Sequence, residues 1–470
     1  MRDSRICEGL QDDLDRAARR IQAATDILVV AHIDADGITS AAIATETCRR
    51  LGKDYECLFA KKMDEITIDT INNSRRSLVW IVDLGSGYLS NFTRDDIVVT
   101  DHHVPDPKWR RKGQTMLDSF ALIEHVNLHK YGMDGSVEGC GATMTYLVSR
   151  TINSYNKNLA YLAVVGACGD IQDRVGYRLT GLNEIVLQDA VECGDVVVRK
   201  DLRLFGRETR PIVQFLQYGN DPGIPGITDN NAGCNRLLAA HGIQLKRDGR
   251  LTVWNDLTDE EKGLICGEIL SLVDPKDADA IYGDVYTLPK FPKEGGLRDA
   301  KEFATALNSC GRYDDAPTGM RMCFGDMCAL RDAGNNRAEH RRNISAALQF
   351  VKQNDLIRVR RYIQYFDAGD SIKETVVGIV TGMILSTGGI RKDLPMIAFA
   401  DADDGIKVSA RADKSLGELG LDLSKIMSEA SGKVGGYGGG HNIAAGATIP
   451  EGCKERFLDI VEEMVRAQLT

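Results

Sequence analysis

The sequence predicts an α/β protein with a parallel-sheet domain at its N-terminus, a smaller α/β domain at its C-terminus, and a largely helical segment between them. Apolar, β-branched runs such as ILVVA (27–31), LVWIV (78–82) and IVVT (97–100) alternate with helical patterns in the first 200 residues. Such runs are typical of buried parallel strands. Prolines and glycines then interrupt the chain, and strand patterns return near residue 356. We therefore expect domains at 1–200, 201–335 and 336–470.

The individual elements follow from hydrophobic periodicity and from helix start and stop signals. We expect helices at about 10–24, 38–51, 141–152, 231–241, 257–273, 297–312 and 337–354. In the C-terminal domain we expect strands in 356–367, 374–385, 395–401 and 406–411, then a glycine run at 435–440, a last strand and a last helix.

Composition and charge describe an ordinary globular chain. It has 470 residues, a net charge of −10 and 43% hydrophobic residues. No apolar run approaches the roughly 20 residues that a membrane span needs, and the first residues lack a signal-peptide core. The twelve cysteines form no CxxC pair, as expected of reduced, mostly buried thiols. We therefore expect a cytoplasmic protein without a membrane segment.

The negative charge gives no global attraction for nucleic acid, but it does not exclude such a substrate. Basic segments such as Arg199–Arg210 could hold phosphates locally. A solvated surface face is the commoner explanation of a segment of this kind.

Carboxylates and imidazoles follow three of the predicted strands directly. They are His32-Ile-Asp34-Ala-Asp36-Gly37, then Asp83, then Asp101-His102-His103. Ligands of open parallel sheets bind at the carboxyl ends of the strands, so these side chains should converge. Closely packed carboxylates repel each other unless cations neutralise them, and a mixed His/Asp set suits Mn²⁺ or another divalent ion. The pattern predicts a two-metal hydrolase.

Each motif also has a plainer explanation. The His32–Gly37 motif could be an acidic turn that caps the next helix. Asp83 could be an N-cap or part of an Asx-turn, and Asp101-His102-His103 could be a surface turn. As metal ligands, His32, Asp34 and Asp36 would point the same way while the backbone stays extended, and Asp83 could bridge two ions. Asp101 could hold the tautomer of an adjacent imidazole. Further along the chain, Asp170 and Asp173 both follow a small apolar segment, and the spacing does not choose between them.

A glycine-rich run near the C-terminus indicates a binding surface. Gly435-Gly-Tyr-Gly438-Gly439-Gly440-His441 follows a strand that ends at Arg411. Consecutive glycines expose backbone N–H groups and let a phosphate or sugar approach closely. Arg411 can grip a phosphate with its fork of donors, and His441 can add a hydrogen bond. The plainer alternative is a flexible loop.

Together, these motifs resemble the four signatures of the DHH phosphoesterase superfamily: D/HxDxD, an isolated Asp, DHH and GxxxD. Gly166-Ala-Cys-Gly-Asp170 is similar to the fourth, which favours Asp170 over Asp173. The resemblance implies one metal held by His32, Asp34 and Asp83, and a second held by Asp36, Asp83, His102 and Asp170. It also implies that His103, supported by Asp101, contacts the scissile phosphate or donates a proton.

The C-terminal motifs resemble the DHHA1 domain. GGYGGGHNIAAG (435–446) is similar to its glycine signature, and Ser409-Ala-Arg411 is similar to its arginine strand. The resemblance implies that Arg411, Gly438, Gly439, Gly440 and His441 bind substrate.

The long middle segment and LRDAKEFATALNSCGR (297–312) resemble archaeal RecJ-like proteins, some of which associate with the GINS replication complex. This resemblance implies an exonuclease for single-stranded DNA or RNA in replication or repair, with two divalent ions, Mn²⁺ expected and Mg²⁺ the alternative. Two other functions stay open. One is a phosphodiesterase for short oligonucleotides or cyclic dinucleotides, and the other is a GINS-associated replisome scaffold with little catalysis.

Overall fold

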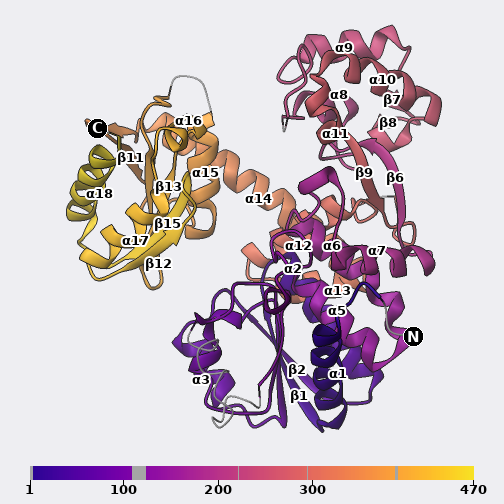
Figure 1. Cartoon of the computed structure of the whole chain (residues 1–470). Helices are drawn as coiled ribbons and strands as arrows, with labels where there is room; N and C mark the ends of the chain where they lie inside the picture. Colours follow the sequence, from indigo (N-terminus) through magenta and orange to yellow (C-terminus); the bar gives the residue numbers. More distant parts are fainter. Residues whose placement is uncertain (1–3, 108–122, 221, 294, 387–389, 470) are drawn as a thin grey trace. The chain divides into compact units, whose positions relative to one another are not determined.

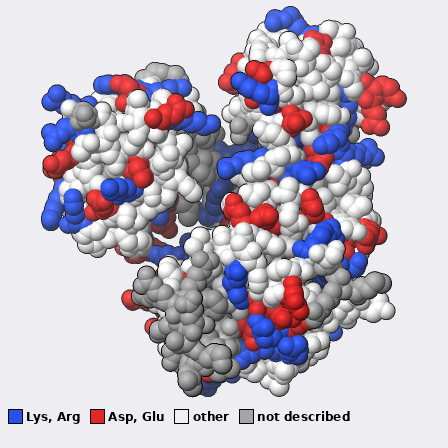
Figure 2. Space-filling view, viewed as in Figure 1, with Lys and Arg blue, Asp and Glu red and all other residues white. Residues whose placement is uncertain are grey.

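The computed structural model describes residues 4–107, 123–220, 222–293, 295–386 and 390–469. The chain divides into two compact units, Met1–Asn335 and Asn336–Thr470, and each is described by itself (Figure 1). Among the described residues, no helix combines the length and the apolar character needed to cross a bilayer. Lys/Arg and Asp/Glu side chains are interspersed on the face shown in Figure 2.

The first unit contains a five-stranded parallel sheet with the strand order β2-β1-β3-β4-β5. These strands are β1 (Asp26–His32), β2 (Asp54–Ala60), β3 (Leu78–Val82), β4 (Ile97–Thr100) and β5 (Glu124–Val126). Because β1, β3 and β4 are neighbours and run the same way, the residues that follow them meet at one edge of the sheet. The predicted parallel-sheet domain is confirmed.

Helices cover both faces of this sheet, with α3 and α1 on opposite sides in Figure 1. One face packs Val29 and Trp80 against the larger helical layer, and the other packs Val30 and Ile81 in a smaller core. This alternation is expected for strands buried on both faces. The helices are α1 (Glu8–Ala23), α2 (Ala35–Arg50), α3 (Glu65–Asn72), α5 (Gly141–Ile152), α6 (Ala160–Gly169) and α7 (Leu182–Glu192).

The middle of the chain is largely helical, as predicted, and begins and ends on an antiparallel pair of strands, β6 (Val197–Leu202) and β9 (Tyr282–Thr287). A separate core that includes Phe215, Trp254 and Ile265 holds this part together. Its helices are α8 (Ile212–Gln217), α9 (Asn231–Ala240), α10 (Asp259–Leu272) and α11 (Ala278–Ile281), with the short strands β7 (Lys246–Arg247) and β8 (Arg250–Leu251). Next come α12 (Ala300–Arg312), α13 (Ala316–Cys323) and α14 (Met327–Gln353).

The second unit is a smaller α/β domain built on a mixed sheet with the order β10-β11-β12-β13-β15-β14. One core lies under α15, and the other packs α17 and α18. Its strands are β10 (Arg358–Val359), β11 (Gln364–Asp367), β12 (Met396–Ala402), β13 (Gly405–Arg411), β14 (Tyr437–Gly440) and β15 (Ala444–Ile449). Its helices are α15 (Glu374–Ser386), α16 (Lys414–Glu418), α17 (Leu423–Lys433) and α18 (Lys454–Leu469).

One predicted strand is wrong. The segment 374–385 forms the helix α15 and not a strand. Its β-branched residues favour a strand by propensity, but its buried positions, Val376, Val377, Val380, Thr381, Ile384 and Leu385, recur with helical spacing. Packing of that stripe against the sheet outweighs the local preference.

Candidate metal centre

The first motif turns from a strand into a helix. β1 ends at His32, and Asp34 caps α2 by accepting a hydrogen bond from the Gly37 N–H at 3.0 Å. The other oxygen of Asp34 lies 2.9 Å from Nδ1 of His32. A Cβ at Gly37 would come within 2.3 Å of the His32 carbonyl oxygen, so this turn requires glycine. Asp34 therefore caps α2 with one carboxylate oxygen and faces His32 with the other.

Asp83 lies between two histidines, and no described residue donates a hydrogen bond to its carboxylate. It follows β3 with a left-handed φ of 60° and is 1% exposed. Both carboxylate oxygens are buried without a donor among the described residues. Oδ2 lies 3.7 Å from Nδ1 of His32, and Oδ1 lies 3.4 Å from Nε2 of His102. An unsatisfied buried carboxylate is costly, so this side chain has the environment of a cation ligand.

Asp36 is buried at the N-terminus of α5. Its carboxylate accepts hydrogen bonds from the N–H groups of Gly141 (2.6 Å) and Ala142 (2.9 Å), which are unpaired donors of that helix end. A Cβ at Gly166 would lie 2.6 Å from Oδ1 of Asp36. The glycine of the fourth motif is therefore explained by close packing of α6 against this carboxylate.

His102 faces three carboxylates with one ring nitrogen. Its Nδ1 donates to the carbonyl of Gly135 at 2.6 Å. Nε2 lies 3.2 Å from Asp170, 3.4 Å from Asp83 and 3.8 Å from Asp36. The carbonyl thus fixes the ring orientation, as outer partners do for metal-binding imidazoles.

The structure brings Asp170 into the cluster and leaves Asp173 out of it. Asp170 follows α6 and faces His102. Asp173 is buried in ion pairs with Arg203 (2.8 Å) and Lys301 (2.7 Å). Spacing in the sequence did not distinguish Asp170 from Asp173, but in the structure only Asp170 lies beside His102.

His103 and Asp101 form a hydrogen-bonded pair at the edge of the cluster. Nδ1 of His103 donates to Oδ1 of Asp101 at 2.8 Å, while 58% of the His103 side chain is exposed. Asp101 is fully buried and also accepts from the N–H groups of His102 (2.7 Å) and Ser86 (2.9 Å). The pairing leaves Nε2 of His103 available to a substrate.

Among the described residues, potential ligand atoms form three groups, and within each group all of these atoms lie within 4.8 Å of one another. The groups are His32, Asp34 and Asp83; Asp36, His102 and Asp170; and Asp83, Asp101, His102 and His103.

The electrostatics of the cluster are dominated by buried carboxylates crowded around His32 and His102. Burial and the charge of Asp36 raise the pKa of Asp170 to about 8. Burial and neighbouring carboxylates also raise the pKa values of Asp36 and Asp83. For His32, burial lowers the pKa, but Asp34 and Asp83 raise it more, to about 11. The cluster therefore favours any cation that enters it.

Sequence inspection missed a buried polar network behind the DHH motif. Asn127, at the end of β5, donates to the Ser86 hydroxyl (2.9 Å) and to the His103 carbonyl (2.9 Å). The Ser86 hydroxyl lies 2.8 Å from Nε2 of His125. The sequence gives only a weak signal for this network, because a single serine or a polar residue at a strand end is common in proteins without such a role.

The residues predicted to bind substrate lie in the second unit. Gly438, Gly439 and Gly440 form the edge strand β14, and the exposed His441 begins the loop to β15. Arg411 ends β13, where its guanidinium donates to the carbonyls of Ala410 (2.9 Å) and Ala445 (3.4 Å).

Arg411 has no carboxylate partner within the described ranges, and burial lowers its pKa. A Cβ at Gly378 would lie 3.1 Å from its Nη2, so a glycine of α15 makes room for the guanidinium. The arrangement leaves a half-buried cation against α15, with β15 between Arg411 and the glycine strand β14.

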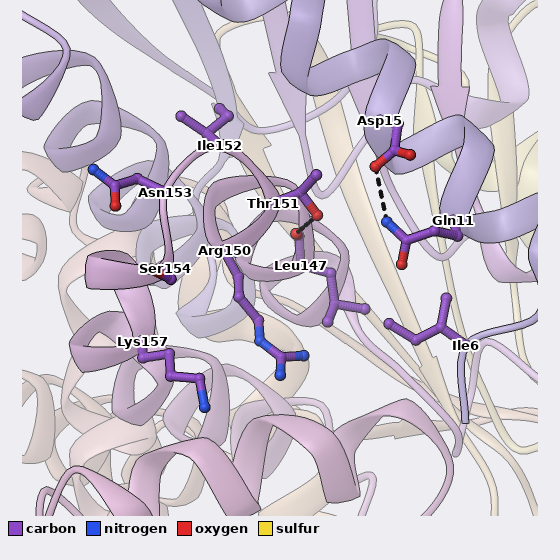
Figure 3. Close-up of a pocket in the computed structure, with 10 residues that line it drawn as sticks. All are labelled: Ile6, Gln11, Asp15, Leu147, Arg150, Thr151, Ile152, Asn153, Ser154 and Lys157. Carbon is purple, nitrogen blue, oxygen red and sulfur yellow. Dashed lines mark hydrogen bonds between the residues drawn. The ribbon is translucent and has the colours of Figure 1, made fainter. Parts of the chain in front are cut away.

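A separate cavity of about 710 Å³ lies beside α1 and α5 (Figure 3). Its cations Arg150 and Lys157 pair with Asp189 at 2.9 and 2.8 Å, and no residue of the acidic cluster lines it. We therefore assign the candidate centre to the sheet edge and not to this cavity.

Comparison with known families places three domains along the chain. The DHH family N-terminal domain matches residues 26–167, the DHH-CID domain matches 204–276, and the DHHA1 domain matches 358–467.

Two curated relatives match nearly the whole chain. An uncharacterized protein of Methanocaldococcus jannaschii is 27% identical over 450 residues, which cover 94% of each chain. The single-stranded-DNA-specific exonuclease RecJ of Dickeya dadantii is 23% identical over 499 residues, which cover 99% of this chain and 71% of that protein.

Two solved structures share the fold. RecJ of Thermus thermophilus in complex with Mn²⁺ superposes with a TM-score of 0.56 at 16% identity, and the match covers 98% of this chain but 55% of that one. CDC45 from Entamoeba histolytica superposes with a TM-score of 0.64 at 11% identity, with 98% of each chain covered.

The fold, the order of the domains and the acidic sheet edge define a DHH/DHHA1 protein of the phosphoesterase superfamily. A DHH-CID domain lies between the other two, and the chain has a RecJ-like fold that it also shares with CDC45 over nearly its whole length. The predicted resemblance to a RecJ-like protein with DHH and DHHA1 domains is confirmed.

Proposed function

We propose that this protein is a metal-dependent exonuclease that hydrolyses phosphodiester bonds of single-stranded DNA or RNA in replication or repair. The observation that carries the proposal is Asp83, a buried carboxylate with no hydrogen-bond donor, set between His32 and His102. The relatives named as exonucleases support the choice of substrate.

The donor set fits divalent cations. His32, Asp34 and Asp83 would hold one ion, and Asp36, His102 and Asp170 would hold a second. Asp83, whose Oδ1 lies 3.4 Å from Nε2 of His102, would be a ligand of both. Carboxylates and imidazoles suit Mn²⁺, with Mg²⁺ as the alternative. Solved RecJ structures that contain Mn²⁺ or Mg²⁺ support the same choice.

When bound, such ions supply an activated water and neutralise charge on the phosphate. The protein's own residues do the rest. His103 is held by Asp101, which raises the pKa of the imidazole to about 9 despite its partial burial. At neutral pH the exposed Nε2 therefore carries a proton that it can donate to the phosphate or to the leaving oxygen.

The second unit would bind nucleotides of the substrate strand. Arg411 supplies a guanidinium with no carboxylate partner in the described chain, and Gly438–Gly440 present an edge strand. Phosphate contacts of this kind set the position of a strand without selecting its sequence. His441 is exposed and can add a hydrogen bond.

A scaffold function is the second candidate, because the CDC45 fold covers the whole chain. The intact set of six candidate ligands favours catalysis, since a scaffold has no need to keep buried carboxylates that repel each other. GINS is the partner that the RecJ-like resemblance implies for either function. Co-purification of the two from a mixture of purified components tests this partnership.

The deciding experiment is digestion of end-labelled single-stranded DNA and RNA of several lengths. The protein is first treated with EDTA, and Mn²⁺ is then added back. We expect stepwise shortening that stops in EDTA and returns with Mn²⁺. Cleavage that resists EDTA would exclude the metal mechanism. Hydrolysis confined to the shortest oligonucleotides or to cyclic dinucleotides would favour the small-nucleotide alternative, and no hydrolysis would favour the scaffold.

A further inference from the structure

A second cavity of about 740 Å³ lies on one face of the β6–β9 ribbon, in the middle of the chain. Because side chains alternate along a strand, Val197, Arg199 and Asp201 share the face of β6 that lines it. Lys200 lies on the opposite face and pairs with Asp284 at 2.9 Å. The basic segment noted in the sequence is thus divided between two environments.

Many of the charges that line the cavity neutralise each other. The guanidinium of Arg207 is 3% exposed and is sandwiched between carboxylates. The ion pairs join Arg207 to Asp201 (3.2 Å) and Asp299 (2.8 Å), Lys262 to Asp201 (3.0 Å), and Arg250 to Asp256 (2.7 Å). The charges in these pairs therefore stabilise the fold and are not available to a ligand.

Three cations of the lining are left over. Arg199, Lys293 and Arg298 form no ion pair within the part of the chain that the structure describes. The Nε of Arg298 is buried and has no hydrogen-bond acceptor there. A buried donor without an acceptor costs on the order of 1–3 kcal/mol, and an anionic ligand would remove that cost.

Two carboxylates of the lining also lack an ion pair in the described chain, but both have other surroundings. Glu208 accepts a hydrogen bond from the Asn255 amide at 2.8 Å. Asp259 lies in the first turn of α10, where the helix dipole favours an acid. The excess of cations is therefore small and confined to Arg199, Lys293 and Arg298, which suits contact with a few phosphates of a ligand.

We propose that this cavity is a second binding site for the sugar–phosphate backbone of a single nucleic-acid strand, with Arg199, Lys293 and Arg298 as its phosphate contacts. Guanidinium groups match phosphate oxygens with paired donors. A cavity of this size accepts a ligand of one or two nucleotides. The identity of the ligand rests on the proposed nuclease function, whereas the anion site rests on the cavity itself.

The test is binding of a fluorescent single-stranded DNA to the full-length protein in EDTA, measured by anisotropy over a range of salt concentrations. The variant is the triple substitution R199Q/K293Q/R298Q, and K200Q is the matched control on the other face of β6. Each lost phosphate contact should reduce the salt slope by about 0.7 and the affinity by roughly fivefold at ~0.1 M salt. K200Q should bind like the wild type.

Unchanged affinity and salt slope in the triple variant would overturn the site, as would an equal loss in K200Q. Retained DNA binding with lost binding of a poly-glutamate peptide would assign the cavity to an acidic protein segment instead. Thermal unfolding checks the fold, and R298Q alone repeats the test should the triple variant unfold. A wild type that binds DNA but hydrolyses nothing with Mn²⁺ would contradict the proposed nuclease and leave this site standing.

Discussion

The side-chain amide of Asn127 donates to the backbone carbonyl of His103 at 2.9 Å. The same amide also donates to Ser86, whose own N–H is bound to Asp101. Burial lowers the pKa of His125 to about 3, so His125 is neutral and its Nε2 can accept the Ser86 hydroxyl proton. The backbone of His103 and its partner Asp101 are therefore both held by one buried network.

Asn127→Asp removes the donor to His103 while keeping the size of the side chain and the acceptor for the His129 N–H. We expect kcat to fall by about 10–100-fold, as for other residues that orient a catalytic site, with little change in KM. Steady-state kinetics on a single-stranded oligonucleotide measure this. Asn156→Asp is the matched control, because Asn156 is equally buried and donates to the Ser149 carbonyl away from the cluster. An equal loss in both variants would show a general effect on folding.

Asp83→Asn should separate metal binding from stability. Without metal, the substitution removes a buried charge that neighbouring carboxylates repel, so the variant should unfold at the same temperature as the wild type or higher. At Mn²⁺ concentrations about 100 times Kd, the wild type should gain roughly 2.7 kcal/mol, and the variant less. Thermal unfolding with EDTA and with Mn²⁺ measures both. Equal stabilisation by Mn²⁺ would contradict a shared ligand.

His103→Gln should affect poor leaving groups most. The protonated imidazole is expected to assist departure of a sugar oxygen, which general acid catalysis accelerates by about 10²–10⁴-fold. A p-nitrophenyl phosphodiester releases a stable phenolate and needs little assistance. We therefore expect a much larger fall in kcat for an oligonucleotide than for the aryl ester. Equal losses on both substrates would exclude the role of proton donor.

Glu302 should make stability depend on pH. It is buried on α12 and accepts hydrogen bonds from the Glu208 N–H (2.7 Å) and from the Thr209 hydroxyl. Burial and the charge of Asp299 raise its pKa to about 7. A raised carboxyl pKa stabilises the fold at low pH, and this contribution of about 3 kcal/mol is lost as pH rises from about 4.5 through 7.

Glu302→Gln imitates the protonated carboxyl, so urea unfolding of the variant should vary less between pH 5 and 8 than that of the wild type. Glu451→Gln is the control, because Glu451 is exposed, and this variant should keep the wild-type pH profile. A Glu302→Gln profile identical to the wild type would show that the carboxyl does not titrate in this range.

Arg411→Gln should weaken substrate binding without affecting metal binding. Its guanidinium has no carboxylate partner in the described residues, so its charge is available to a phosphate. We expect KM to rise several-fold and the stabilisation by Mn²⁺ to stay unchanged. Arg391→Gln is the control, because Arg391 is exposed and already paired with Asp393. Unchanged KM in Arg411→Gln would remove this residue from the substrate site.

Much of the fold was predictable because its signals are local. The strands before His32, Asp83 and Asp101 are short apolar runs that end in polar residues, and all three form in the sheet. The segment 374–385 was wrongly predicted as a strand because it is rich in β-branched residues. Only the positions that are buried in the structure show the helical period of its apolar residues.

The sequence by itself determined the strand ends, the types of candidate ligand and the resemblance to DHH and DHHA1 domains, because these depend on residues that are close in the chain. Only the tertiary structure decided that Asp170 joins the cluster while Asp173 pairs with Arg203 and Lys301. It also decided that α5 presents its N–H groups to Asp36, and that Asn127 holds His103. These relationships join segments far apart in sequence, so no local pattern encodes them and only the packing of helices on the sheet brings them together.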